Sequence, residues 1–74
     1  MSSEQIMSLA SDFARFGVTF SDGLTDEEVA KAWDVFSLNG FDVKDMNTFN
    51  ALIDKAASVG TEFDSLGATM LKHD

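Results

Sequence analysis

The sequence predicts an all-α protein, a compact bundle of three main helices followed by a short fourth helix at the C-terminus. Three observations lead to this prediction. Apolar residues recur at steps of three and four residues in four segments, which is the spacing of one helical face. Residues 24–29 carry a complete helix start signal, and the chain contains no proline. With 74 residues and no visible linker, residues 1–74 are expected to form a single small helical domain.

The first helix is expected to begin after Ser2 or Ser3, either of which can cap a helix N-terminus, and to end near Gly17. Apolar side chains follow one helical face through this segment, and polar side chains occupy the opposite face. The apolar positions are Ile6, Leu9, Ala10, Phe13 and Phe16. We therefore expect this face to be buried.

Residues 17–23 are expected to form a loop. Val18 and Phe20 alternate with polar residues, as in a strand, but a lone strand has no partner to pair with in this chain. Both side chains are therefore expected to point from the loop into the core.

The second helix has the strongest start signal in the chain. Thr25 is positioned to cap it, and Glu28 three residues later completes a capping box. Leu24 and Val29 lie where a hydrophobic staple forms. The apolar face then continues through Ala32, Trp33 and Phe36. Asn39-Gly40 supplies the left-handed residue that commonly ends a helix.

The third helix is expected to begin near Asp42 or Asp45 and to end at Gly60. A short fourth helix is expected to restart at Thr61, with Asp64 as its capping-box partner. The apolar face of the third helix consists of Met46, Phe49, Leu52, Ile53, Ala56 and Val59. That of the fourth consists of Phe63, Leu66 and Met70.

The aromatic residues fall into two groups. Five lie on the apolar helical faces and are expected to form much of the core: Phe13, Phe16, Trp33, Phe36 and Phe49. Replacing Trp33 with alanine is expected to cost about 3–5 kcal/mol. The other aromatic residues, at or beside helix ends, are Phe20, Phe41 and Phe63. Two of these three exposed together would form an apolar patch that marks an interface.

The charge balance is strongly acidic, with 13 Asp and Glu against 5 Lys and Arg, for a net charge of −8. This balance argues against direct binding of nucleic acid or of a membrane surface, because both carry negative charge. The N-terminal residues lack the basic start and apolar run of a signal peptide, so a cytoplasmic protein is expected.

The sequence contains no motif for catalysis, so we do not expect an enzyme. There is no cysteine to act as a nucleophile, and the single histidine, His73, lies next to the C-terminus. A calcium loop is also not expected. Placing Gly23 or Gly40 at the sixth position of such a loop puts Val18 or Val35 at the first position, which requires an oxygen ligand. We expect no metal and no cofactor.

Three hypotheses for function follow. The first is a small acidic protein-interaction module, such as an inhibitor of the phage-encoded or nucleic-acid-mimicking kind, that binds a basic surface on a partner protein. The second is a structural protein that assembles as a homo-oligomer. The third is a small-ligand or anion sponge that binds at the helix N-termini near Thr25 and Thr61. The candidate partner-binding residues are Asp22, Asp26, Glu27, Glu28, Phe20 and Phe41. The alternative for the four carboxylates is a purely structural role, in which they cap the second helix and complement its dipole.

Overall fold

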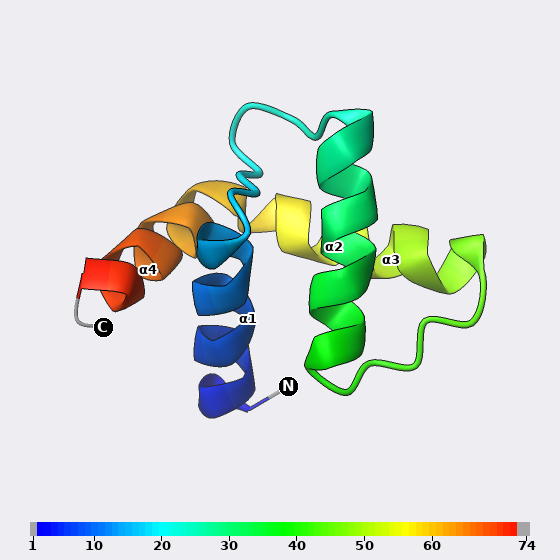
Figure 1. Ribbon diagram of the computed structural model, residues 1–74, viewed down its shortest axis with the longest axis horizontal. Helices are drawn as coiled ribbons and strands as arrows, with labels where there is room; N and C mark the ends of the chain where they lie inside the picture. Colours follow the sequence, from blue (N-terminus) through cyan, green and yellow to red (C-terminus); the bar gives the residue numbers. More distant parts are fainter. Residues whose placement is uncertain (1, 73–74) are drawn as a thin grey trace.

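The structure, a computed structural model, describes residues 2–72, and these fold into four helices without a strand (Figure 1). The helices are α1 (Ser3–Arg15), α2 (Asp26–Leu38), α3 (Met46–Ser58) and α4 (Gly60–Lys72), of 13 residues each. The prediction of an all-α bundle is confirmed, but the C-terminal helix is as long as the other three. His73 lies outside the described residues.

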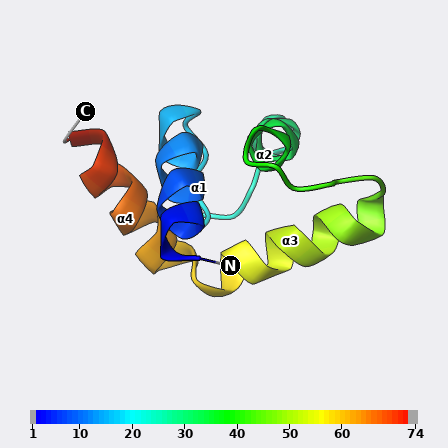
Figure 2. The ribbon, with the colours of Figure 1, turned by 90° about the horizontal axis from the view of Figure 1, so that it is seen from below.

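The helices are arranged as two crossed pairs. α1 and α2 run in opposite directions, α3 crosses α2, and α4 lies across α1 (Figures 1 and 2). α1 packs most extensively on α4, with smaller contacts between α1 and α2 and between α3 and α4. α3 reaches α2 through aromatic side chains, since the Trp33 and Phe49 ring centroids lie 4.8 Å apart. The core therefore lies where the four helices meet.

The predicted helix starts are confirmed for the first three helices. The side chain of Ser2 accepts a hydrogen bond from the first turn of α1. Thr25 and Glu28 form both bonds of a capping box at the start of α2. Asp45 caps α3 by accepting from the backbone N–H of Thr48 at 2.8 Å. These local signals are sufficient because a cap involves residues only three positions apart.

α2 ends at the predicted position, and its last residues also hold α1. Gly40 has a φ of 83°, the left-handed conformation that glycine adopts without a steric penalty. The side chain of Asn39 donates to the carbonyl oxygen of Val35 and to the carboxylate of Asp12, both at 2.9 Å. Ser8 donates to the Asn39 side-chain oxygen at 2.7 Å. The helix cap is thus also a polar link between α1 and α2.

Phe13 lies at the centre of the core. Its ring makes edge-on contacts with Phe20 from the loop, Phe36 from α2 and Phe63 from α4, at centroid distances of 4.9, 5.3 and 5.7 Å. All four side chains are buried. Edge-on geometry is the favourable arrangement of aromatic rings. The prediction that Phe20 points into the core is confirmed.

The junction between α3 and α4 differs from the prediction. Gly60 begins α4 instead of ending α3, and Thr61 lies inside the first turn of α4. The backbone N–H of Phe63 donates to the carbonyl oxygen of Val59 at 2.8 Å, so the chain bends here without an intervening loop. Gly60 is buried against Phe20, and a Cβ on it would lie 3.0 Å from the Phe20 Cβ. Tertiary packing explains this glycine, and the prediction that Gly60 ends the third helix is wrong.

Some residues predicted to face the core are exposed. Ile6, Met46 and Val59 are 39%, 56% and 48% exposed. Met46 is the first residue of α3, and this end of α3 extends beyond α2 (Figure 1). Phe16 and Trp33 are only half-buried at the edge of the core. The helical periodicity predicted the correct face, but the crossing of the helices leaves their ends uncovered.

Candidate functional site

The loop between α1 and α2 is held to the start of α2 by Glu28. One carboxylate oxygen of Glu28 accepts from the backbone N–H of Thr25 at 3.1 Å, and the other accepts from that of Thr19 at 3.1 Å. The bond from Thr19, followed by those from Thr25, holds the pKa of the Glu28 carboxyl below its ordinary value. The sequence predicted the capping box but not the bond from Thr19.

These hydrogen bonds make the fold sensitive to acid. A lowered pKa in the folded state means that Glu28 adds stability above its ordinary pKa and loses this contribution as pH falls through the folded value. Asp45, with its pKa lowered by the N–H of Thr48, acts in the same direction. We expect Glu28→Gln to lower the melting temperature at neutral pH, and the difference from the parent to shrink as pH falls to about 3. Thermal melts across this range test it, and a constant difference would contradict it.

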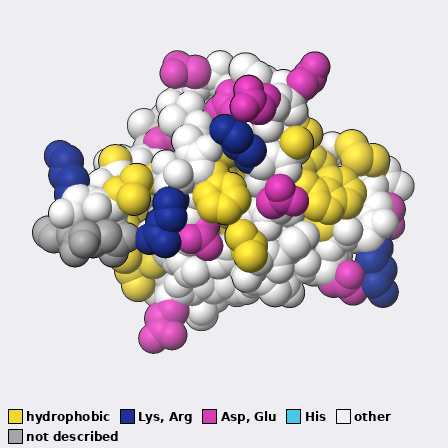
Figure 3. All heavy atoms as spheres, viewed as in Figure 1, with side chains coloured by type: hydrophobic (Ala, Val, Ile, Leu, Met, Phe, Trp, Pro, Cys, Tyr) yellow, Lys and Arg dark blue, Asp and Glu magenta, His cyan; other side chains and the backbone are white. Residues whose placement is uncertain are grey.

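Three further acidic side chains, Asp22 in the loop and Asp26 and Glu27 in the first turn of α2, are exposed. We call them the acidic edge. Acidic side chains gather over the loop and the start of α2 at the top of Figure 3. Glu27 lies 3.6 Å from the ammonium group of Lys31, an exposed i,i+4 pair of the kind that contributes little to stability. Among residues 2–72, no group of acidic, His or Cys side chains is placed to hold a metal ion.

The predicted aromatic patch does not form. Phe20 and Phe63 are buried, and Phe41 is half-buried with its ring 5.6 Å from that of Phe36. Phe20, which we had proposed as a partner-binding residue, therefore belongs to the core and does not present its ring to a partner. Phe41 retains a partly exposed surface.

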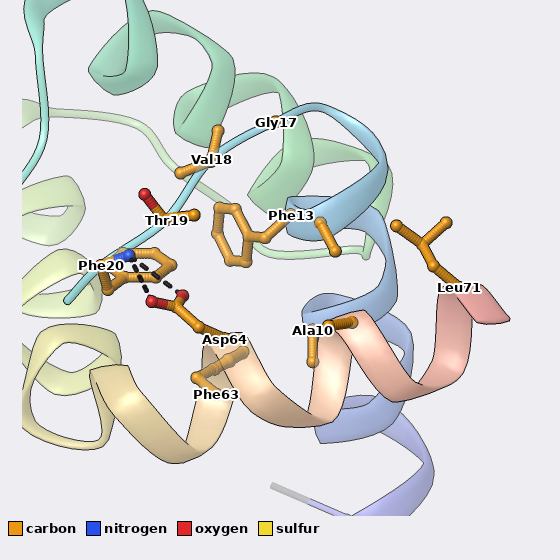
Figure 4. A pocket seen from close by; sticks show the side chains of 11 residues that line it. Ala10, Phe13, Gly17, Val18, Thr19, Phe20, Phe63, Asp64 and Leu71 are labelled. Carbon is orange, nitrogen blue, oxygen red and sulfur yellow. Dashed lines mark hydrogen bonds between the residues drawn. The ribbon is translucent and has the colours of Figure 1, made fainter. Parts of the chain in front are cut away.

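Asp64 holds the same loop from the side of α4. Its carboxylate accepts from the backbone N–H of Phe20 at 3.0 Å (Figure 4). It also accepts from the backbone N–H of Ser21 at 3.0 Å and from the Ser21 hydroxyl at 2.7 Å. It therefore does not serve as a capping-box partner of Thr61. A pocket of about 230 Å³ lies beside it, between α1, α4 and the loop. Glu28 and Asp64 together fix the loop at two points.

Removing the Asp64 carboxylate tests the importance of this anchor. We expect Asp64→Ala to lower the free energy of unfolding by about 1–3 kcal/mol, because partly buried backbone donors lose a charged acceptor. Asp54→Ala, at an exposed position of α3, removes the same charge and serves as the control. Urea denaturation measures both. If both variants lose the same free energy of unfolding, the hydrogen bonds of Asp64 contribute nothing to stability beyond its charge.

A larger apolar groove of about 390 Å³ lies where the four helices approach each other. Its polar lining residues are Lys55, Ser58 and Glu62. Its main apolar lining residues are Ile6, Leu9, Phe36, Leu52, Val59 and Leu66. The helical periodicity of the sequence predicts that these apolar side chains are buried in the core. The groove could not be predicted from the sequence, because it depends on how far each crossing helix covers the apolar face of its neighbours.

Comparison of the chain with models of protein families, with curated proteins and with solved structures found no match. Within residues 2–72, none of the helices has the length and apolar character needed to cross a lipid bilayer. The fold and the two surfaces define the class of the molecule as a four-helix domain with an acidic edge and an apolar groove.

Proposed function

We propose that this protein is a small protein-interaction module that presents the acidic edge to a basic surface on a partner protein. An inhibitor that occupies a cationic nucleic-acid-binding groove in place of phosphate is the most specific form of this proposal. The net charge of −8 supports it, because a field of one sign attracts a cationic partner and speeds encounter.

The observation that carries the proposal is the fixed geometry of the acidic edge. Glu28 accepts hydrogen bonds from the loop backbone on both sides of Asp22, at Thr19 and Thr25. Asp64 adds bonds on the N-terminal side, so the loop backbone is ordered before any partner arrives. Asp26 and Glu27 project from the first turn of a capped helix. Preordered charges bind at a lower entropic cost than charges on a flexible segment.

The test is an affinity pull-down from a cell lysate at low and high salt, read by mass spectrometry. We expect a partner with a basic surface that is retained at low salt and lost at high salt, since exposed charge pairs are screened. The triple variant Asp22→Asn, Asp26→Asn, Glu27→Gln is expected to lose this partner. Recovery that is insensitive to both salt and the triple variant would refute the proposal.

The control variant carries the same change in charge elsewhere. Glu4→Gln, Asp34→Asn and Asp54→Asn neutralise three exposed side chains on α1, α2 and α3. It is expected to retain the partner better than the triple variant at equal salt. Equal losses would mean that net charge alone drives binding and that the acidic edge has no special role.

A further inference from the structure

The proposed role of the acidic edge gives no function to the apolar groove. Ile6 on α1 and Val59 at the end of α3 line it and are 39% and 48% exposed. In a protein of this size, an open hollow lined by aliphatic side chains departs from the usual burial of apolar surface and marks an interaction site.

We propose that the groove binds an amphipathic helix of the partner protein, one with an apolar face and mainly basic flanks. The inference rests on the proposed function, because the net charge of −8 attracts a basic partner and the groove supplies the apolar anchor. Helix-in-groove docking of this kind uses two or three apolar side chains on one face of the bound helix.

The dimensions of the groove suit a helix. Along α3 the wall is formed by Leu52, Ala56 and Val59, which follow the spacing of one helical face over two turns. This wall is about 10 Å long, from a rise of about 1.5 Å per residue. A partner helix lying alongside would place apolar residues at positions i, i+4 and i+7 into the groove.

Charge selects a basic partner over a second copy of this chain. Two copies would each bring a net charge of −8, and a two-fold contact would set one hollow against another. At the groove itself, Glu62 favours a basic residue on the bound helix, whereas Lys55 disfavours one. The pair therefore also favours one orientation of the helix in the groove.

The experiment uses two variants with the same change in charge. Val59→Glu places a carboxylate in the groove, and Leu38→Glu places one at an apolar position that is 68% exposed and is not part of the groove lining. The probe is a fluorescent synthetic peptide of leucine and lysine with an amphipathic helical pattern. A peptide of the same composition in scrambled order is the control. Fluorescence anisotropy gives the affinities, and circular dichroism checks that both variants fold.

The two variants are expected to bind the peptide with different affinities. Both variants are more negative than the parent, so simple attraction to a cationic peptide would strengthen binding in both. Docking in the groove instead predicts that Val59→Glu weakens binding by about tenfold or more, whereas Leu38→Glu leaves it unchanged or tighter. Equal responses, or no preference for the patterned peptide over the scrambled one, would overturn the inference.

The acidic-edge triple variant separates this inference from the proposed function. Loss of binding in the triple variant but not in Val59→Glu would refute the groove and leave the acidic edge intact. The reverse result would support the groove and count against the acidic edge. Analytical ultracentrifugation of the protein alone tests whether the groove instead binds a second copy of the chain. A dimer that dissociates in the Val59→Glu variant would assign the groove to self-association and overturn the inference.

Discussion

Replacing Phe36 with alanine is expected to lower the free energy of unfolding by about 3–5 kcal/mol. Phe36 is 2% exposed, and its ring contacts those of Phe13, Phe41 and Phe49 at 5.3, 5.6 and 6.3 Å. Phe36 therefore connects the aromatic residues around Phe13 with Phe49 of α3. A domain of this length has a total stability of about 4–11 kcal/mol, at roughly 0.05–0.15 kcal/mol per residue. At the lower end of this range a loss of about 5 kcal/mol exceeds the total stability, and the variant would be largely unfolded.

Trp33→Ala is the comparison for this experiment. Trp33 is half-buried at the edge of the core. We therefore expect Trp33→Ala to lower the free energy of unfolding by less than the value of about 3–5 kcal/mol predicted from the sequence. Urea denaturation followed by circular dichroism measures both variants. A greater loss at Trp33 than at Phe36 would contradict the position of the core described above.

Gly67→Ala is expected to destabilise the protein although alanine is the better helix former. Gly67 is buried on α4 where this helix crosses α1, and a Cβ there would overlap the carbonyl oxygen of Ala10. It would also lie 3.0 Å from the Cβ of Ala14. Overpacking of this kind costs about 1–3 kcal/mol, against a gain of about 1 kcal/mol in helix propensity. Backbone atoms cannot move aside as a side chain can, so the cost should prevail.

The control lies on the same helix. Ser65 is exposed, so Ser65→Ala improves helix propensity without entering the interface between α1 and α4. We expect its stability to stay within about 0.5 kcal/mol of the parent. Thermal melts compare the two variants, and a stabilised Gly67→Ala would show that α1 and α4 are not in close contact at this point.

Signals contained within a few residues predicted the secondary structure well. Thr25 with Glu28, and Asp45 before the third helix, form the predicted caps, and Asn39-Gly40 ends α2 as predicted. Each of these features depends on hydrogen bonds or backbone angles within about one helical turn. The fourth helix was predicted less well, because its start at Gly60 depends on the packing of Phe20 from the distant loop.

Contacts between distant parts of the chain could not be predicted from the sequence. Asp64 bonds the backbone of Phe20 and Ser21 across more than 40 positions, and nothing around Asp64 distinguishes it from a capping residue. Ile6 and Val59 have the periodicity of core residues, yet they line an open groove. Periodicity defines which side of a helix is apolar, but it does not show how far a neighbouring helix covers that side.

For the candidate site, the sequence alone predicts an acidic chain with four carboxylates around a helix start, those of Asp22, Asp26, Glu27 and Glu28. The tertiary structure separated their roles, with Glu28 bonded to the loop and the other three exposed. It also placed Phe20 in the core and created the groove. Composition and helix caps can be read from a few neighbouring residues, whereas burial and grooves depend on the angles at which whole helices cross.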